Sequence, residues 1–263
     1  MKKEKTFTNE NNQAFNYIKF HVLKNYRKSY LILAMISTIT LLKMSYVSSQ
    51  ASNYNLSIFD YFYKLFEGCR PIITSNSDNL KLPIDWIFIC ISYIFFTCLF
   101  SEDKMNLSVV LLKKRVKWLK YQILLCLLIA VSFLIIVFTI IFIYYSFQCR
   151  SVHFLLFAFS NKNISHAMIT YINFIPLTLF TISIISHTLS LYFNKYVSSI
   201  TLLILLLSSI YYNSPLLLFY QLLYIRINYE PILYLKFYIL LNVFIITISI
   251  ILDYYKINKI DVL

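Results

Sequence analysis

The sequence gathers its apolar residues into runs that are long enough to cross a lipid bilayer. Of the 263 residues, 59% are hydrophobic and only 13% are charged, which leaves too little polar surface for a soluble domain of this length. A bilayer-spanning helix needs about 20 predominantly apolar residues, and several runs approach that length. The sequence therefore predicts an all-α, polytopic integral membrane protein.

Six transmembrane helices are predicted, preceded by a basic segment. The spans cover about 30–47, 84–100, 121–147, 167–193, 197–212 and 237–252. Residues 30–263 thus form one transmembrane domain. Residues 1–29 form a basic N-terminal segment in which Phe15, Ile18, Val22 and Tyr26 recur at helical spacing. This pattern favours an interfacial helix on an anionic membrane surface, with a solvated basic tail as the alternative.

The distribution of positive charge predicts the orientation in the cell membrane. With the N-terminus inside, sixteen Lys and Arg residues lie in cytoplasmic segments and six lie in external segments. Because cytoplasmic loops are enriched in these residues, both termini are predicted to be cytoplasmic. The same enrichment accounts for the net charge of +13, so no nucleic-acid partner is expected.

Two external connections are predicted to contain further helical structure. In the first, Asp60, Lys64 and Glu67 share one face at ion-pair spacing, opposite an aromatic face. This helix is expected to rest on the outer membrane interface and to end at Gly68. Between spans five and six, prolines interrupt an apolar segment at 213–232, which favours a re-entrant or surface-lying hairpin.

The composition argues against catalysis and against a nucleotide site in this chain. Gly68 is the single glycine, so neither a phosphate-binding loop nor a dinucleotide fingerprint can occur. Any ATP must be bound by another chain, and no cofactor or metal is expected here. The five cysteines lack metal-binding spacing, although Cys69 and Cys149 are predicted to be external. The expected function is not enzymatic.

Span four carries a polar stripe within an otherwise apolar helix. Ser183, Ser186, His187 and Ser190 lie within about one helical face. An intramembrane histidine is a candidate for a transport pathway. Serine and histidine also bridge neighbouring helices, and we interpret the stripe primarily as helix packing.

The most unusual segment is "VVLLKKRVKWLKYQ", residues 109–122, which lies in the predicted cytoplasmic loop between spans two and three. It has five cations and a tryptophan but no acidic residue. Val109, Leu112, Val116 and Leu119 recur on one helical face. We interpret the segment as a helix that docks on a cytoplasmic partner, while a purely topological role for its cations is the alternative. The predicted docking residues are Leu112, Lys113, Lys114, Arg115, Val116, Lys117 and Trp118.

Four short motifs resemble a known family of membrane proteins. These are "LPIDW" before span two, "LLKKRVKWLKYQ" after it, "YYNSPLLLFYQLLYIR" before span six, and the ending "YYKINKIDVL". In this order they are similar to the permease subunits of Gram-positive type-2 ABC exporters. Lys113–Arg115 replace the family's usual Ser-Arg opening, and Trp118 is the only tryptophan of its motif.

The resemblance implies a function in transport. A chain of this family pairs with a second permease subunit, as a homo- or heterodimer, and with cytoplasmic ATPase subunits that bind the ATP. The implied cargo is an amphipathic or antimicrobial peptide such as a bacteriocin, exported or cleared in self-protection. Two alternatives remain open: a stand-alone immunity or sensor protein that binds a peptide without transport, and an intramembrane enzyme.

Overall fold

The computed structural model describes residues 29–49, 58–68, 83–100, 115–148, 166–212, 214, 216–223 and 232–259. Within these residues the chain is helical and contains no β-strand, which agrees with the predicted all-α class. The elements, in chain order, are the Ser29–Ser49 helix, α2 (Ile58–Phe66), α3 (Ile84–Phe100), α5 (Arg115–Gln148), α7 (His166–Tyr192), α8 (Lys195–Tyr211), the 3-10 helix η3 (Leu218–Leu222) and α10 (Ile232–Lys259). The predicted N-terminal interfacial helix lies outside the described residues.

Four of these helices are long and apolar enough to cross a membrane. Their membrane-length segments are Ser29–Ser49, Val116–Phe147, Phe174–Tyr192 and Lys236–Lys259. The helices α3 and α8 are also apolar, but each has only 17 residues. At a rise of 1.5 Å per residue, each is about 25 Å long, slightly less than the hydrocarbon core of a typical bilayer. The chain is therefore a membrane protein with four clear candidate spans and two shorter apolar helices.

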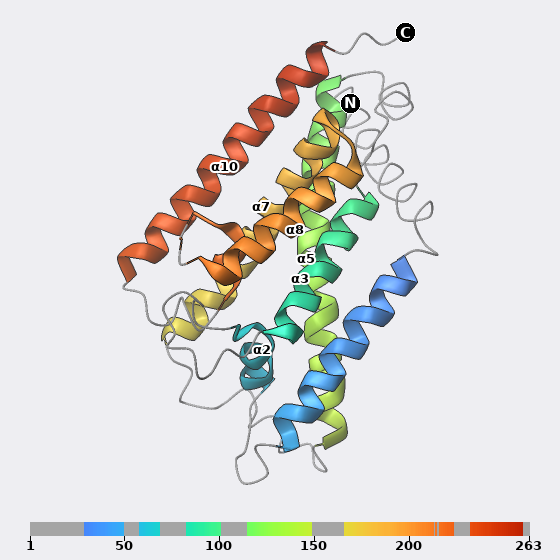
Figure 1. The fold of residues 1–263 in the computed structure, drawn as a ribbon, viewed down its shortest axis with the longest axis vertical. Helices are drawn as coiled ribbons and strands as arrows, with labels where there is room; N and C mark the ends of the chain where they lie inside the picture. The colour runs from blue at the N-terminus through green and yellow to red at the C-terminus, as the bar shows by residue number, and fades with distance from the viewer. Residues whose placement is uncertain are drawn as a thin grey trace, which may run out of the picture.

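Successive long helices run in opposite directions (Figure 1). At one end, Lys43 near the end of the Ser29–Ser49 helix contacts Asp85 in the first turn of α3. At the opposite end, Cys98 near the end of α3 contacts Ser199 near the start of α8. The start of α5 lies beside the ends of α7 and α10 at this second end, because Trp118 packs with Leu191 and Ile257.

The helix α7 is the centre of the bundle. It contacts α3, α5, α8, α10 and η3. In its membrane-length segment 67% of the residues are buried, compared with 22% in α10 and 28% in the Ser29–Ser49 helix. The Ser, Thr and His side chains of α7 from Thr178 to Ser190 are therefore buried in protein, whereas most of α10 and of the Ser29–Ser49 helix is not covered by the described part of the chain.

Two helices extend beyond the predicted ends of their spans. The helix α5 begins at Arg115 rather than near residue 121, so the second half of the basic segment is continuous with span three. The helix α10 continues to Lys259 rather than ending near residue 252. Both extensions contain Lys, which has a high helix propensity, and neither contains Gly or Pro. The predicted boundaries marked the end of the apolar run and not the end of the helix.

The short helix α2 forms where it was predicted, but its aromatic side chains are buried against other helices. It ends before Gly68, which has a φ of +72°, and its Lys64 pairs with Glu67 at 3.0 Å. Tyr61, Phe62 and Phe66 are buried rather than spread over a membrane interface. Tyr61 packs edge-on against Tyr144 of α5 at a centroid distance of 5.9 Å. The aromatic face thus anchors α2 to α5, because a protein surface is available to bury it.

The connection between α8 and α10 enters the bundle. All five residues of η3 are buried, and η3 contacts both α7 and α8. Gln221 of η3 accepts a hydrogen bond from the Asn242 amide of α10 at 2.7 Å. Leu223, just after η3, packs on the backbone of Gly68. Residues 218–223 of this connection are therefore buried in the bundle, whereas Leu216 just before them is exposed.

Candidate functional site

The polar stripe of α7 is buried between helices. Ser183, Ser186, His187 and Ser190 are each at most 3% exposed. The hydroxyl of Tyr93, on α3, donates to the Leu179 carbonyl at 2.7 Å and also lies against Ser183 Oγ. Because Tyr93 has a single hydroxyl hydrogen, Ser183 is the donor in the second bond. This part of the stripe fastens α7 to α3.

The next turn of α7 joins three helices. Ser186 Oγ lies 3.4 Å from Thr97 Oγ1 of α3 and 3.4 Å from Ser198 Oγ of α8. Ser198 also donates to the Ser186 carbonyl at 2.9 Å. These small side chains allow close approach of the backbones, a role that glycine often has in membrane proteins and that this chain assigns to serine. These serines hold α7 close to both α3 and α8.

His187 lies in a different environment from the serines. Its ring packs against the indole of Trp118, with the ring centroids 5.5 Å apart and the planes tilted by 46°. Trp118 is fully buried and forms a cluster with Leu119, Leu191 and Ile257. The His187 ring thus connects the centre of the bundle to the first turns of α5. Ser190 donates to the His187 carbonyl within α7 at 2.7 Å.

The structure divides the predicted docking segment. Leu112, Lys113 and Lys114 lie outside the described residues, and Arg115 begins α5. Val116 is 50% exposed and Lys117 is partly buried.

Trp118 does not face a partner at the surface, since its indole is 0% exposed. Val116, on the apolar face that was predicted to dock, is 50% exposed, whereas Leu119 of the same face packs with Trp118 inside the bundle. The reason is that α5 packs here against both α7 and α10, whose positions the local pattern does not contain.

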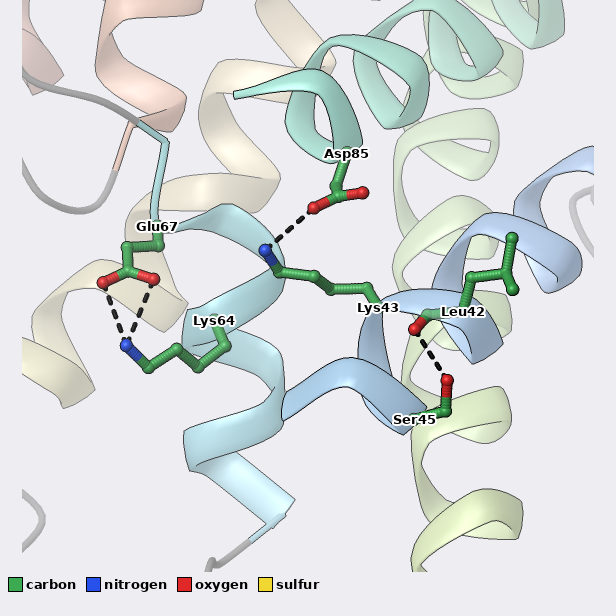
Figure 2. A network of polar contacts seen from close by, with 6 residues as sticks. All are labelled: Leu42, Lys43, Ser45, Lys64, Glu67 and Asp85. Atoms are coloured by element: carbon green, nitrogen blue, oxygen red, sulfur yellow. Dashed lines mark hydrogen bonds and ion pairs between the residues drawn. The ribbon is translucent and has the colours of Figure 1, made fainter. Parts of the chain in front are cut away.

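Ionised side chains are distributed unevenly between the two ends of the bundle. At the end where α3 begins, Lys43 pairs with Asp85 at 2.8 Å and Lys64 pairs with Glu67 at 3.0 Å (Figure 2). The end where α5 begins carries five described lysines. They are Lys117, Lys120, Lys195, Lys256 and Lys259. Asp253 is the one described acidic residue near this second end, and it is buried.

Asp253 lies just beyond the predicted sixth span, 237–252, but inside α10, where it is 1% exposed. The apolar residues Ile250 and Ile257 flank it at three- and four-residue spacing, and both pack in the cluster around Trp118. Once α10 is known to continue to Lys259, this spacing places Asp253 on the same inner face as the two isoleucines.

The described residues contain no group of three or more His, Cys, Asp or Glu side chains positioned to bind a metal ion. Cys90, Cys98 and Cys126 are buried and form no disulfide within the described residues, while Cys69 and Cys149 lie outside those residues. No protein-family model, characterised protein or solved structure matches this chain.

Proposed function

We propose that the chain is a permease subunit of an ABC transporter that exports or clears an amphipathic, antimicrobial-type peptide. ATP is bound by a separate cytoplasmic ATPase subunit that docks near residues 109–117, and a second permease subunit completes the pathway. The proposal rests on the resemblance of the four motifs and on one structural observation. That observation is the contact of Trp118 with His187 and Ile257 at the start of α5.

The Trp118 contact supports a mechanical role for the basic segment. Residues 115–118 belong to the same rigid helix as span three, so displacement of this segment also displaces α5. Through Trp118 the displacement acts directly on α7, the central helix, and on the end of α10. A topological anchor needs only charge at the membrane surface and no buried aromatic contact between three helices. Coupling between a docked ATPase and the bundle needs such a contact.

The six-span arrangement with both termini in the cytoplasm is part of this proposal. The alternating directions of the helices are consistent with it, and α3 and α8 fall at the short end of the range for spanning helices. The five lysines at the end where α5 begins favour a cytoplasmic position for that end. The exposed apolar faces of α10 and of the Ser29–Ser49 helix are surfaces on which a second permease subunit and lipid could both be accommodated.

Co-purification tests the proposal directly. Membranes from the native host are extracted in mild detergent, and the amount of ATPase retained per permease is measured at low and high salt. We expect an ATPase to be retained. The combined change of Lys113, Lys114 and Arg115 to Gln should reduce its retention most strongly at low salt, because at high salt these rim charges are already screened in the wild-type protein.

The matched control changes Arg70, Lys81 and Arg150 to Gln, which removes the same charge from predicted external segments. These changes should leave retention of the ATPase unaltered. If wild-type protein confers resistance to a peptide but retains no ATPase under any condition, the transporter proposal is wrong and the stand-alone immunity protein is favoured.

A further inference from the structure

One side of α10 is left uncovered along its second half. The helix lies at the edge of the bundle (Figure 1), and Phe244, Ile248, Ile251 and Tyr255 recur on it at three- and four-residue spacing. Each of these side chains is at least 40% exposed. At 1.5 Å per residue the apolar stripe is about 16 Å long, which is close to half of a hydrocarbon core of about 30 Å. The stripe therefore matches the acyl chains of a single leaflet.

The apolar stripe ends at two lysines that lie over tyrosine rings. Lys259 follows Tyr255 by four residues, and its ammonium nitrogen lies 4.3 Å from the centre of the Tyr255 ring. The ammonium nitrogen of Lys256 lies 5.1 Å from the centre of the Tyr192 ring of α7. The Tyr192 hydroxyl donates to the Leu252 carbonyl at 2.9 Å, which fixes this ring against α10. Because a cation is attracted to an aromatic face, these contacts hold both positive charges at the end of the stripe.

The charge at this end of α10 favours an anion from outside the chain. Lys256 and Lys259 are three residues apart on one helix, so their like charges are neighbours and repel each other. The predicted cytoplasmic segments, to which both lysines belong, contain sixteen Lys and Arg residues but six Asp and Glu residues. This count covers the whole sequence, so the acidic residues of these segments cannot neutralise all of their cations. An anion beside Lys256 and Lys259 relieves the repulsion between them.

We propose that the end of α10 binds an anionic glycerophospholipid, with its phosphate beside Lys256 and Lys259 and its acyl chains along the stripe from Tyr255 to Phe244. Basic groups at the ends of membrane helices bind such head groups, and the apolar stems of lysine reach to the membrane surface. A soluble acidic protein would satisfy the two cations but would leave the stripe uncovered. A lipid satisfies both. The inference requires only that this end of α10 lies at a membrane surface, so it is independent of the proposed transport function.

Photolabelling of the full chain in lipid nanodiscs tests the proposal. The probes are phosphatidylglycerol, which is anionic, and phosphatidylcholine, which is zwitterionic, and both carry the same photoactivatable group in one acyl chain. Each probe is a small fraction of a phosphatidylcholine bilayer at low salt. We expect phosphatidylglycerol to label residues 244–255 more strongly than phosphatidylcholine does. Changing Lys256 and Lys259 to Gln should reduce this preference by about fivefold for each lysine, the attraction of one lysine to an anionic membrane surface.

Two control variants isolate this contact, and unchanged thermal unfolding shows that they are folded. Changing Lys256 and Lys259 to Arg keeps both charges and should keep the preference. Changing Lys64 in α2 and Lys236 near the start of α10 to Gln removes the same charge elsewhere and should leave the preference unaltered. Equal labelling of residues 244–255 by the two lipids, or a preference that persists in the Gln variant of Lys256 and Lys259, would overturn the proposal. If that variant instead loses the ATPase while its labelling is unchanged, the two lysines bind a protein and the lipid proposal is wrong.

Discussion

Gly68 occupies a position where any other residue would be strained in two ways. Its φ of +72° lies in the left-handed region that side chains with a Cβ disfavour. A Cβ atom at this position would also overlap Leu223 Cδ2 and lie 3.3 Å from Leu223 Cβ. The single glycine thus ends α2 and admits the buried connection after η3.

Gly68→Ala should destabilise the protein by roughly 2–4 kcal/mol, the sum of the backbone strain and of overpacking against Leu223. The measurement is the free energy of unfolding in detergent titrations. In a Leu223→Ala background the same change should cost less, because the overlap with Leu223 Cδ2 is removed, while the backbone strain and the 3.3 Å approach to the Cβ of residue 223 remain. Equal costs in the two backgrounds would show that Leu223 does not contact this backbone.

Some residue positions follow from the sequence alone and others do not. The ion pair of Lys64 with Glu67 follows from their spacing within one helix, and the structure contains it. The inward positions of Trp118 and Asp253 do not follow from local spacing alone. They depend on which helices pack against α5 and α10, and a hydropathy pattern does not give those neighbours.

At the scale of elements, α5 unites the basic segment and span three in one helix. With 34 residues it is about 51 Å long, so it extends well beyond a hydrocarbon core of about 30 Å. The buried side of its first turns packs on α7 and α10 through Trp118, while Val116 remains half exposed. A partner can therefore contact the exposed side of α5 while Trp118 stays inside the bundle.

Trp118→Ala should lower the free energy of unfolding by about 3 kcal/mol, because it removes a large buried side chain and leaves a cavity between three helices. Val116→Ala, two residues earlier and half exposed, should change it by about 0.5 kcal/mol or less. Chemical unfolding of both variants in detergent distinguishes them. Similar small effects would mean that Trp118 is not packed within the chain.

For the whole molecule, apolar run length predicted the positions and order of the apolar helices, four of which are long enough to cross a membrane. The predicted span 84–100 has the bounds of α3, because Pro83 and a polar segment limit the apolar run on both sides. The start of α5 and the end of α10 were missed, because the apolar run indicates where the chain leaves the bilayer, and charged residues continue each helix beyond that point. The sequence did not decide whether the segment that contains η3 is re-entrant or lies on the surface. The hydrogen bond that holds it joins Gln221 to Asn242, and these two residues belong to different segments.

The proposed function depends most on one arrangement. The start of α5 and the ends of α7 and α10 must lie together on the cytoplasmic side. Reporter fusions that read the side of the membrane test it, placed after Ser108, after Ser75, after Asn161 and at the C-terminus. We predict cytoplasmic signals at Ser108 and at the C-terminus, and external signals at Ser75 and Asn161, because sixteen Lys and Arg residues then lie in cytoplasmic segments. An external signal at the C-terminus or at Ser108 would contradict the six-span arrangement and remove the site proposed for the ATPase.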